Sequence, residues 1–407
     1  MKNEKHALNG IKVVEWSLAI TGPWVGKCLG DHGAEVIKIE STVNQDVTRL
    51  SVPYAGGIAH PDRSATFLRF NTSKRSITLN LKTDEGKAIL EELIAWADVF
   101  FNNQRPGAMK RLGLSYERIR KINPSIIAMD ISNYGQTGPY SEAGGWGNMT
   151  MAMGGHTFLT RDRDMVPTAP GWLATADVIG PMNALVAVLA ALDYRRRTGN
   201  GMYLDVSQLE ALVHFLGVGL LDYSANGRVQ QPIGNHDPEY APHGAYPCRG
   251  DDQWCAIAVT SENEWQNLCR CMGDPLWAKE ARFGNMASRK IHEDELDRRI
   301  GEWTRSFEKR ELMEWLQSKG IPAGAVQNIA DVLEEDPQVK AHDLYPRIEH
   351  PVMGECYHGG WPFLLSKTPT RMSTCPCLGA DNDYVLNDIL GVGDERFVEL
   401  MTEGILE

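Results

Sequence analysis

Apolar and polar positions alternate in short runs through the first third of the chain, and stretches of helical period separate these runs. The runs predict strands at 10–16, 34–40, 76–81, 99–103 and 126–132. The stretches between them predict helices at 24–29, 83–97 and 116–122. Strands that alternate with helices predict an α/β fold with a Rossmann-like parallel sheet. In such a sheet, the loops after the carboxyl ends of the strands line the ligand crevice.

A carboxylate, Asp177, precedes a long apolar helical pattern. Apolar residues at 185, 186, 188, 189 and 192 fit the 3.6-residue period of a buried helix, and Arg195–Arg197 with Gly199 end it. Asp177 therefore lies at or just before the helix N-terminus, where the helix dipole and free backbone N–H groups stabilise a carboxylate. That position suits a nucleophile, and a helix-capping Asp is the alternative that this segment leaves open.

The later pattern predicts a second, smaller α+β domain. A strand at 203–207 and a helix at 208–223 precede a Gly- and Pro-rich connection at 227–242. A hairpin-like segment at 244–259 and helices near 264–272 and 292–304 follow. We expect residues 1–225 to form the first part of the large domain, 226–325 the small domain with its linkers, and 326–407 a return segment that completes the large domain.

Composition and charge narrow the classes of function. The chain has 407 residues, which favours two domains, and 43% hydrophobic with 23% charged residues is ordinary for a globular protein. A net charge of -12 argues against nucleic acid or an anionic membrane as partner. No apolar run is expected to reach the roughly 18–20 residues that a membrane span requires. Residues 1–6 lack the apolar stretch of a secretory signal, so a cytoplasmic location is expected.

The cysteines and glycines give no sign of a metal or dinucleotide site. Cys269/Cys271 and Cys375/Cys377 are spaced C-x-C, whereas most structural zinc sites use C-x-x-C. We interpret the eight cysteines as reduced thiols and expect no metal. The loop after the first strand lacks G-x-G-x-x-G, which weakens an NAD-binding interpretation.

Eight stretches, in register over essentially the whole chain, resemble the class III CoA-transferases of the formyl-CoA, carnitine-CoA and benzylsuccinate CoA-transferase types. They are 8–15, 22–23, 33–40, 71–77, 81–86, 105–113, 134–139 and 197–201. The resemblance implies an interlocked, ring-like dimer, either a homodimer or a heteromer with a related subunit. It also implies acyl-CoA and carboxylic acid substrates, with coenzyme A thioesters as substrates and no permanently bound cofactor.

The resemblance gives Asp177 the role of covalent nucleophile, which forms an aspartyl-CoA thioester during transfer. It places Ala19 and Ile20 beside the thioester and gives Lys74 and Arg75 to phosphates, although a solvated charge pair is the alternative. The residues that it places along the CoA channel are Asn103, Gln104, Arg105, Arg111 and Tyr134. For Arg111 the alternative is a surface helix charge.

Aromatic residues suggest the acyl group. Trp24, Trp146, Trp172 and His243 fall in segments that should approach it, with Gly244 beside them, which hints at an aromatic or arylsuccinate acceptor and a succinyl-CoA donor. The alternative is that the tryptophans fill the core. Arg49 and Arg69 are candidates to clamp a second carboxylate.

Three positions depart from the family pattern. Ile20 and Ser41 stand where some transferases have Gln and Arg, and 241–246 has one Gly with His243 where some have a glycine tract.

Two other functions are possible for a chain of this pattern. An acyl-CoA racemase would use a His where this chain has Trp146, and indole cannot abstract a proton. A supporting subunit of a heteromeric transferase would not need Asp177.

Overall fold

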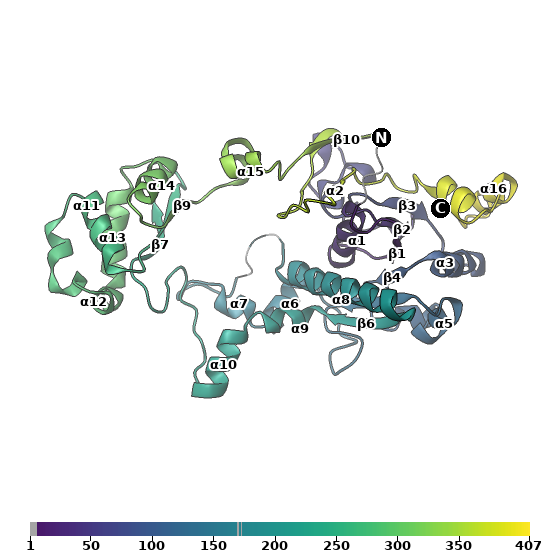
Figure 1. Ribbon diagram of the computed structural model, residues 1–407, viewed down its shortest axis with the longest axis horizontal. Coiled ribbons are helices and arrows are strands. Elements are labelled where there is room, and N and C mark those ends of the chain that lie inside the picture. Colours follow the sequence, from purple (N-terminus) through teal and green to yellow (C-terminus); the bar gives the residue numbers. More distant parts are fainter. Residues whose placement is uncertain (1–5, 169–170, 172) are drawn as a thin grey trace. The chain divides into compact units, whose positions relative to one another are not determined.

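A computed structural model describes residues 6–168, 171 and 173–407 (Figure 1). Trp172 lies outside the described residues. The chain forms two compact units, each with its own core. Unit 1 comprises Met1–Thr157, Ala169–Gly227 and Ala341–Glu407, and unit 2 comprises Phe158–Thr168 and Arg228–Lys340. The domain boundaries drawn from the sequence stay a prediction.

Unit 1 is built on a six-stranded sheet with the order β3-β2-β1-β4-β5-β6. Every neighbouring pair is parallel, as the sequence predicts. The strands are β1 (Lys12–Trp16), β2 (Glu35–Glu40), β3 (Arg75–Thr78), β4 (Val99–Asn102), β5 (Ile127–Ser132) and β6 (Met202–Ser207). The strand order reverses between β1 and β4, and in open α/β sheets ligands bind beyond the carboxyl ends of strands at such a switch point.

Helices cover both faces of this sheet. Val13 faces α1 (Thr21–Asp31) and α8 (Ala176–Thr198), and its neighbour Val14 faces the opposite core, in keeping with the two-residue period of a strand. The opposite core includes α3 (Asp84–Trp96), α5 (Tyr116–Ile122), the π-helix Tyr384–Ile389 and α16 (Asp394–Thr402). Thr83 caps α3 by accepting the Gly86 N–H.

The helix predicted after Asp177 is α8, and Asp177 lies in its first turn. Gly199 ends it in a left-handed conformation with φ 76°. The sequence predicted no apolar run long enough to span a membrane. Among the described helices, however, α8 is long and apolar enough to do so by length and composition. Ala184, Val188 and Ala191 are nonetheless buried in the core shared with the sheet, which is the packing of a core helix. The cytoplasmic location stays a prediction.

The prediction of a single helix at 208–223 is wrong. The segment is divided into α9 (Gln208–His214) and α10 (Gly217–Asn226), because Leu216 leaves helical geometry with ψ 18° and a glycine follows it. The remaining elements of unit 1 are short. They are α2 (Ala65–Phe70), α4 (Ala108–Arg111), α6 (Gly147–Met153), the antiparallel pair β10 (Arg347–His350) and β11 (Gly354–Tyr357), and 3₁₀ turns at Ala55–Gly57 and Pro61–Arg63. Helix α7 (His156–Leu159) lies at the sequence boundary between the units.

Unit 2 is an α+β unit around a small antiparallel sheet. The sheet has the order β7-β8-β9, with β7 (His243–Pro247), β8 (Trp254–Ala258) and β9 (Ala323–Ala325). Its helices are α11 (Glu262–Cys271), α12 (Met286–Ile291), α13 (Glu293–Thr304) and α14 (Lys309–Ser318), with 3₁₀ turns at Leu276–Lys279 and Ala281–Phe283. The π-helix Asp331–Glu335 and α15 (Pro337–Ala341) follow. All eight cysteines are free thiols.

Candidate active site

The loop that follows β1 is held by buried charges. Lys38 Nζ donates to the Ser17 carbonyl at 2.6 Å, and Ser17 Oγ donates to Glu15 Oε1 at 2.6 Å. Lys38 also forms ion pairs with Glu15 and Asp46, and all three side chains are fully buried. Charges at this depth persist only when they are paired, so the network fixes one conformation of the loop.

Two further contacts fix the next residues of this loop. Asn103, just after β4, accepts the Leu18 N–H at 2.8 Å and donates to the Leu18 carbonyl at 2.7 Å. Asp46 accepts the Ala19 N–H at 3.0 Å. Ala19 has φ 62°, a left-handed conformation that is rare for a residue with a Cβ and is retained where surrounding contacts impose it. The loops after β1 and β4 are thus joined at the switch point of the sheet.

Asp177 is held by residues that begin two other helices. Its Oδ1 accepts a hydrogen bond from Thr21 Oγ1 at 3.2 Å and one from Gln208 Nε2 at 3.4 Å. Thr21 begins α1, and Gln208 begins α9. Burial raises the pKa of Asp177 above its ordinary value, while the two hydrogen bonds oppose that rise. The result is a poorly solvated but oriented carboxylate.

Gly147, the first residue of α6, packs against the other oxygen of Asp177. A Cβ built on Gly147 would overlap Asp177 Oδ2 and the Ala174 side chain. Glycine is therefore required here by the close approach of the carboxylate to the α6 backbone.

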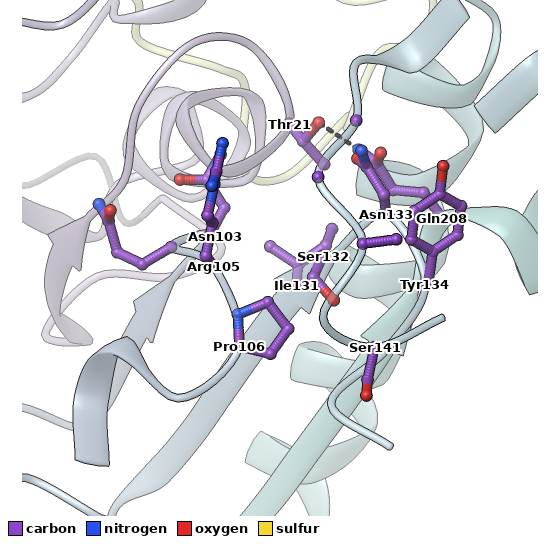
Figure 2. A pocket seen from close by; sticks show the side chains of 14 residues that line it. Thr21, Asn103, Arg105, Pro106, Ile131, Ser132, Asn133, Tyr134, Ser141 and Gln208 are labelled. Carbon is purple, nitrogen blue, oxygen red and sulfur yellow. Dashed lines mark hydrogen bonds between the residues drawn. The ribbon is translucent and has the colours of Figure 1, made fainter. Parts of the chain in front are cut away.

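A cavity of about 100 Å³ lies beside the two residues that hold Asp177 (Figure 2). Thr21 and Gln208 line it, and Figure 2 shows the hydrogen bond between them. The rest of the wall is mostly polar and comprises 103–106, 131–134, Ser141 and 143–145. Gln208 and Ser132 each line the cavity and each carry one buried oxygen, Oε1 and Oγ respectively, that has no hydrogen-bond partner among the described residues. Buried polar atoms without partners are uncommon and call for a ligand or water.

Two larger cavities adjoin the first. One, of about 320 Å³, is lined by residues including Asn102, Lys110, Tyr116 and Tyr203, and the other, of about 270 Å³, by residues including Trp16, Ser41, Leu81 and Lys82. Gln104 lines all three cavities, and Arg105 lines the first two. The three cavities therefore lie next to one another around Gln104.

Cations without carboxylate partners gather around these cavities. Lys82, Arg105, Lys110 and Arg111 form no ion pair with any residue that the structure describes. Arg105 and Lys110 line the cavities that adjoin each other, Lys82 lines the third, and Arg111 is exposed on α4. In a chain of net charge -12, such cations indicate an anionic ligand.

Lys74 and Arg75, predicted to bind phosphate, have partners inside the protein. Lys74 is buried, with its Nζ 2.8 Å from Glu15 Oε2 and bonded to the Pro23 carbonyl and Asn71. Arg75 pairs with Glu35 at 3.3 Å and Asp381 at 3.0 Å. Their charges are already balanced, which leaves little reason for a phosphate to bind there.

The sequence profile of CoA-transferase family III matches residues 8–382. The chain belongs to this family. It is 30% identical to Succinyl-CoA--D-citramalate CoA-transferase of Chloroflexus aurantiacus over 98% of both chains, and 31% identical to Succinate--glutarate CoA-transferase of Agrobacterium fabrum over 96% of this chain and 97% of that one. A CAIB/BAIF family protein from Brucella suis has the same fold, with TM-score 0.87 and 31% identity over 95% of this chain and 100% of that one.

The protein is therefore a CoA-transferase whose substrates are CoA thioesters. The structure brings Thr21 and Gln208 to Asp177, and neither was predicted from the sequence. Of the residues that were predicted, it brings Asn103, Gln104, Arg105 and Tyr134 to the small cavity. Ile20 is the residue before α1 and packs beside Trp24 rather than lining the cavity.

The predicted substrate residues of the CoA-transferase lie in different surroundings. Trp24 is 7% exposed and packs on Phe70, with ring centroids 5.5 Å apart. Trp146 precedes α6 and is 65% exposed. His243 and Gly244 lie on β7 in unit 2, where His243 Nδ1 is 2.8 Å from the Asn235 carbonyl. Trp24 thus has the packing of a core residue, and the substrate roles stay predictions.

The two arginines considered as partners for a second substrate carboxylate have contacts inside the protein. Arg49 is buried and paired with Glu40 and Asp62, each at 2.7 Å, so its charge is balanced within the protein. Arg69 lies over the Trp24 ring, 5.6 Å from its centroid.

In unit 2, His236, Glu293 and Asp294 come close enough to hold a metal, but the Lys290 ammonium already binds Glu293. That cation makes the group an ion-pair cluster.

Proposed function

We propose that this CoA-transferase moves CoA from succinyl-CoA to a small polar carboxylic acid through a covalent intermediate on Asp177. The observation that carries the proposal is the placement of Asp177: Thr21 and Gln208 orient its carboxylate, and both also line a polar cavity. Partial burial removes water from the carboxylate, which leaves it more reactive toward a thioester than a fully hydrated one.

The proposed transfer proceeds in four displacements. An Asp177 oxygen attacks the donor thioester carbonyl, and CoA leaves as the thiolate, so that a mixed anhydride forms. The thiolate then attacks the aspartyl carbonyl and releases the donor acid, which leaves an aspartyl-CoA thioester. The acceptor carboxylate attacks this thioester and again releases the thiolate with formation of an anhydride. The thiolate finally attacks the acceptor's carbonyl, which gives the new acyl-CoA and restores the Asp177 carboxylate.

Three neighbouring cavities that share Gln104 support a proposed path for CoA. We assign the thioester end to the small cavity, with Asn103 and Tyr134 on its wall and Ala19 in the adjoining loop. The pantetheine portion passes Gln104, which borders all three cavities. The phosphates lie near the unpaired cations Lys82, Arg105, Lys110 and Arg111. Lys74 and Arg75 are left out of the proposed site because carboxylates within the protein neutralise them.

The proposed acceptor is small and polar rather than aromatic. A cavity of about 100 Å³ with a mostly polar wall suits a short acid better than an arylsuccinate. Similar relatives support this choice, because their names give succinyl-CoA, D-citramalate, L-malate, succinate and glutarate as substrates.

We also propose that the enzyme acts as a dimer, of two copies or of this chain and a related one. Relatives that are 30% and 31% identical are the alpha and beta subunits of Succinyl-CoA--L-malate CoA-transferase. Helix α10 has no buried residue, and Val218 and Leu221 are 83% and 71% exposed. An apolar helix surface of this kind supports burial against a second subunit. The ring-like, interlocked form is carried over from the family resemblance.

Trapping tests the covalent mechanism. The protein is incubated with succinyl-CoA and treated with hydroxylamine, which converts an aspartyl anhydride or thioester into a hydroxamate. The proposal predicts a mass change on the peptide that contains Asp177 and none in Asp177→Asn. Exchange of the substrate's α-proton with deuterated water, without transfer between acids, would instead support a racemase.

A further inference from the structure

The loop that follows β2 binds the side-chain carboxylate of Glu407. Glu407 Oε2 accepts hydrogen bonds from Ser41 Oγ and, at 2.8 Å, from the Thr42 N–H. The Val43 N–H donates to the same oxygen at 3.4 Å. Donors from three consecutive residues therefore converge on one oxygen. Successive backbone N–H groups in such an arrangement form a binding site for an anion, which Glu407 fills here.

The backbone around Glu407 sets the position of this carboxylate. The Ile405 carbonyl accepts the Asn80 N–H at 2.8 Å, and the Glu407 carbonyl accepts a hydrogen bond from Thr78 Oγ1 at 2.5 Å. Leu406, between them, is 3% exposed and belongs to a core cluster of unit 1. The segment is therefore packed against the end of β3, and this packing keeps the carboxylate beside the loop.

Glu407 and the loop that binds it form part of the wall of the cavity of about 270 Å³. Lys82, which has no ion pair among the described residues, lies on the same wall. Glu40 also lies there, but Arg49 neutralises it at 2.7 Å. Apolar side chains complete the wall, namely Trp16, Ile39, Leu79, Leu81 and Leu112. An apolar wall with a few charged groups suits the nucleotide portion of CoA, a flat base with phosphates beside it.

The position of the anion site in the sheet indicates which part of a nucleotide comes near it. The strand order β3-β2-β1-β4-β5-β6 is that of Rossmann dinucleotide-binding folds. In those folds a carboxylate accepts a hydrogen bond from a ribose hydroxyl, or an arginine accommodates a phosphate on the ribose. Here Ser41 follows the last residue of β2, and the charge bound to it is the Glu407 carboxylate. The site therefore presents an anion to the ribose.

We propose that Glu407 keeps the 3′-phosphate of CoA out of the anion site at 41–44, so that this phosphate contributes little to binding. The inference rests on the proposed function and deepens it, with the nucleotide portion of CoA in this cavity. The Glu407 carboxylate occupies the N–H groups that a phosphate would use, and its negative charge repels a phosphate nearby. Glu407 is thus a residue that determines specificity for the nucleotide.

Titration calorimetry with CoA and with 3′-dephospho-CoA measures the contribution of the phosphate without turnover. The two ligands differ only in the group on the ribose. In the native enzyme their dissociation constants should differ by less than about fivefold. In Glu407→Ala the freed donors can bind the phosphate, so CoA should bind about tenfold or more tightly than 3′-dephospho-CoA.

Two further variants separate occupation of the site from net charge. Glu407→Gln keeps an amide oxygen for the N–H groups but removes the charge, so its preference should fall between those of the native enzyme and Glu407→Ala. Glu403→Ala is the matched control: it makes the same change in net charge, but Glu403 is exposed, pairs with Arg396 and does not line the cavity. This control should keep the native ratio. The melting temperature shows whether each variant folds.

The outcomes distinguish this inference from the proposed function. A native preference for CoA of about fivefold or more would contradict the inference, as would a Glu407→Ala variant in which the preference does not rise. An equal change in Glu403→Ala would assign the effect to net charge and also contradict it. These results leave the covalent mechanism intact, because they concern binding alone. If neither ligand binds, the proposed path of CoA is wrong, and the inference with it. If Asp177→Asn transfers CoA at the native rate, the proposed covalent mechanism fails, whatever the binding ratio.

Discussion

Gln208 Nε2 lies 3.4 Å from Asp177 Oδ1, so the first residue of α9 holds the carboxylate in the first turn of α8. The junction of β6 and α9, which follow each other directly, thereby positions a residue that comes 31 positions earlier in the chain. Thr21 holds the same oxygen from the start of α1. The orientation of Asp177 thus depends on three helix starts.

The pH profile should reveal the environment of Asp177. Burial raises the pKa of this carboxyl group above its ordinary value, and only the ionised form attacks. Activity should therefore fall as the pH falls through this raised pKa. Thr21→Val and Gln208→Met remove hydrogen bonds that lower the pKa, so they should move the acid limb of kcat/KM to higher pH. A limb at the same pH in both variants would show that these bonds do not act on Asp177.

Gly147→Ala should damage the site without unfolding the protein. The new Cβ would overlap Asp177 Oδ2, so the carboxylate must turn away from its position. We expect kcat to fall by about 100-fold, the order of loss that follows a displacement of about 1 Å. Gly217→Ala is the matched control, because a Cβ there meets no atom within 4 Å. Equal rates for the two variants would contradict the packing of Asp177 on α6.

Arg105 and Arg75 should differ in their effect on acyl-CoA binding. Arg105→Ala removes an unpaired cation at two cavities and should raise the KM for the acyl-CoA by about tenfold, with a weaker salt dependence. Arg75→Ala removes a cation paired with Glu35 and Asp381 and should leave that KM unchanged. Initial rates at two ionic strengths check both. A raised KM in Arg75→Ala with an unchanged KM in Arg105→Ala would instead indicate that Arg75 binds the phosphates.

Lys74→Met should test the charge network beneath the loop after β1. It removes the ammonium at 2.8 Å from the buried Glu15 carboxylate and leaves Lys38, at 3.4 Å, as the remaining cation, so the cost approaches about 3–5 kcal/mol, that of a buried pair broken from one side. Urea denaturation should show a loss of free energy of unfolding of this order. Arg118→Ala, which breaks a more exposed pair with Glu91, should cost about 1 kcal/mol or less. Similar losses in the two variants would contradict the role of the network.

The sequence predicted features that depend on local pattern. The alternation of strands with helices predicted the parallel sheet. The apolar period after Asp177 predicted α8, with the carboxylate in its first turn. It could not predict Thr21 and Gln208, because each looks locally like an ordinary residue at a helix start. Their role arises from contacts over 156 and 31 positions.

Residues of the same type in the sequence also differ in their burial in the structure. Lys74 and Arg105 are both cations near the ends of strands, yet Lys74 is buried against Glu15, which is 59 positions away. Arg105 instead lines two cavities. Trp24 and Trp146 differ in the same way, since one packs on Phe70 and the other is 65% exposed. Such differences depend on tertiary packing, which a single sequence does not contain.

The most direct test of the central claim is the mass of the Asp177 peptide after incubation with succinyl-CoA and hydroxylamine. The account predicts a hydroxamate on Asp177 in the native enzyme, no adduct in Asp177→Asn, and a loss of kcat/KM of at least about 10⁴-fold in that variant. An unmodified Asp177 in an enzyme that is turning over, together with near-native transfer by Asp177→Asn, would contradict it.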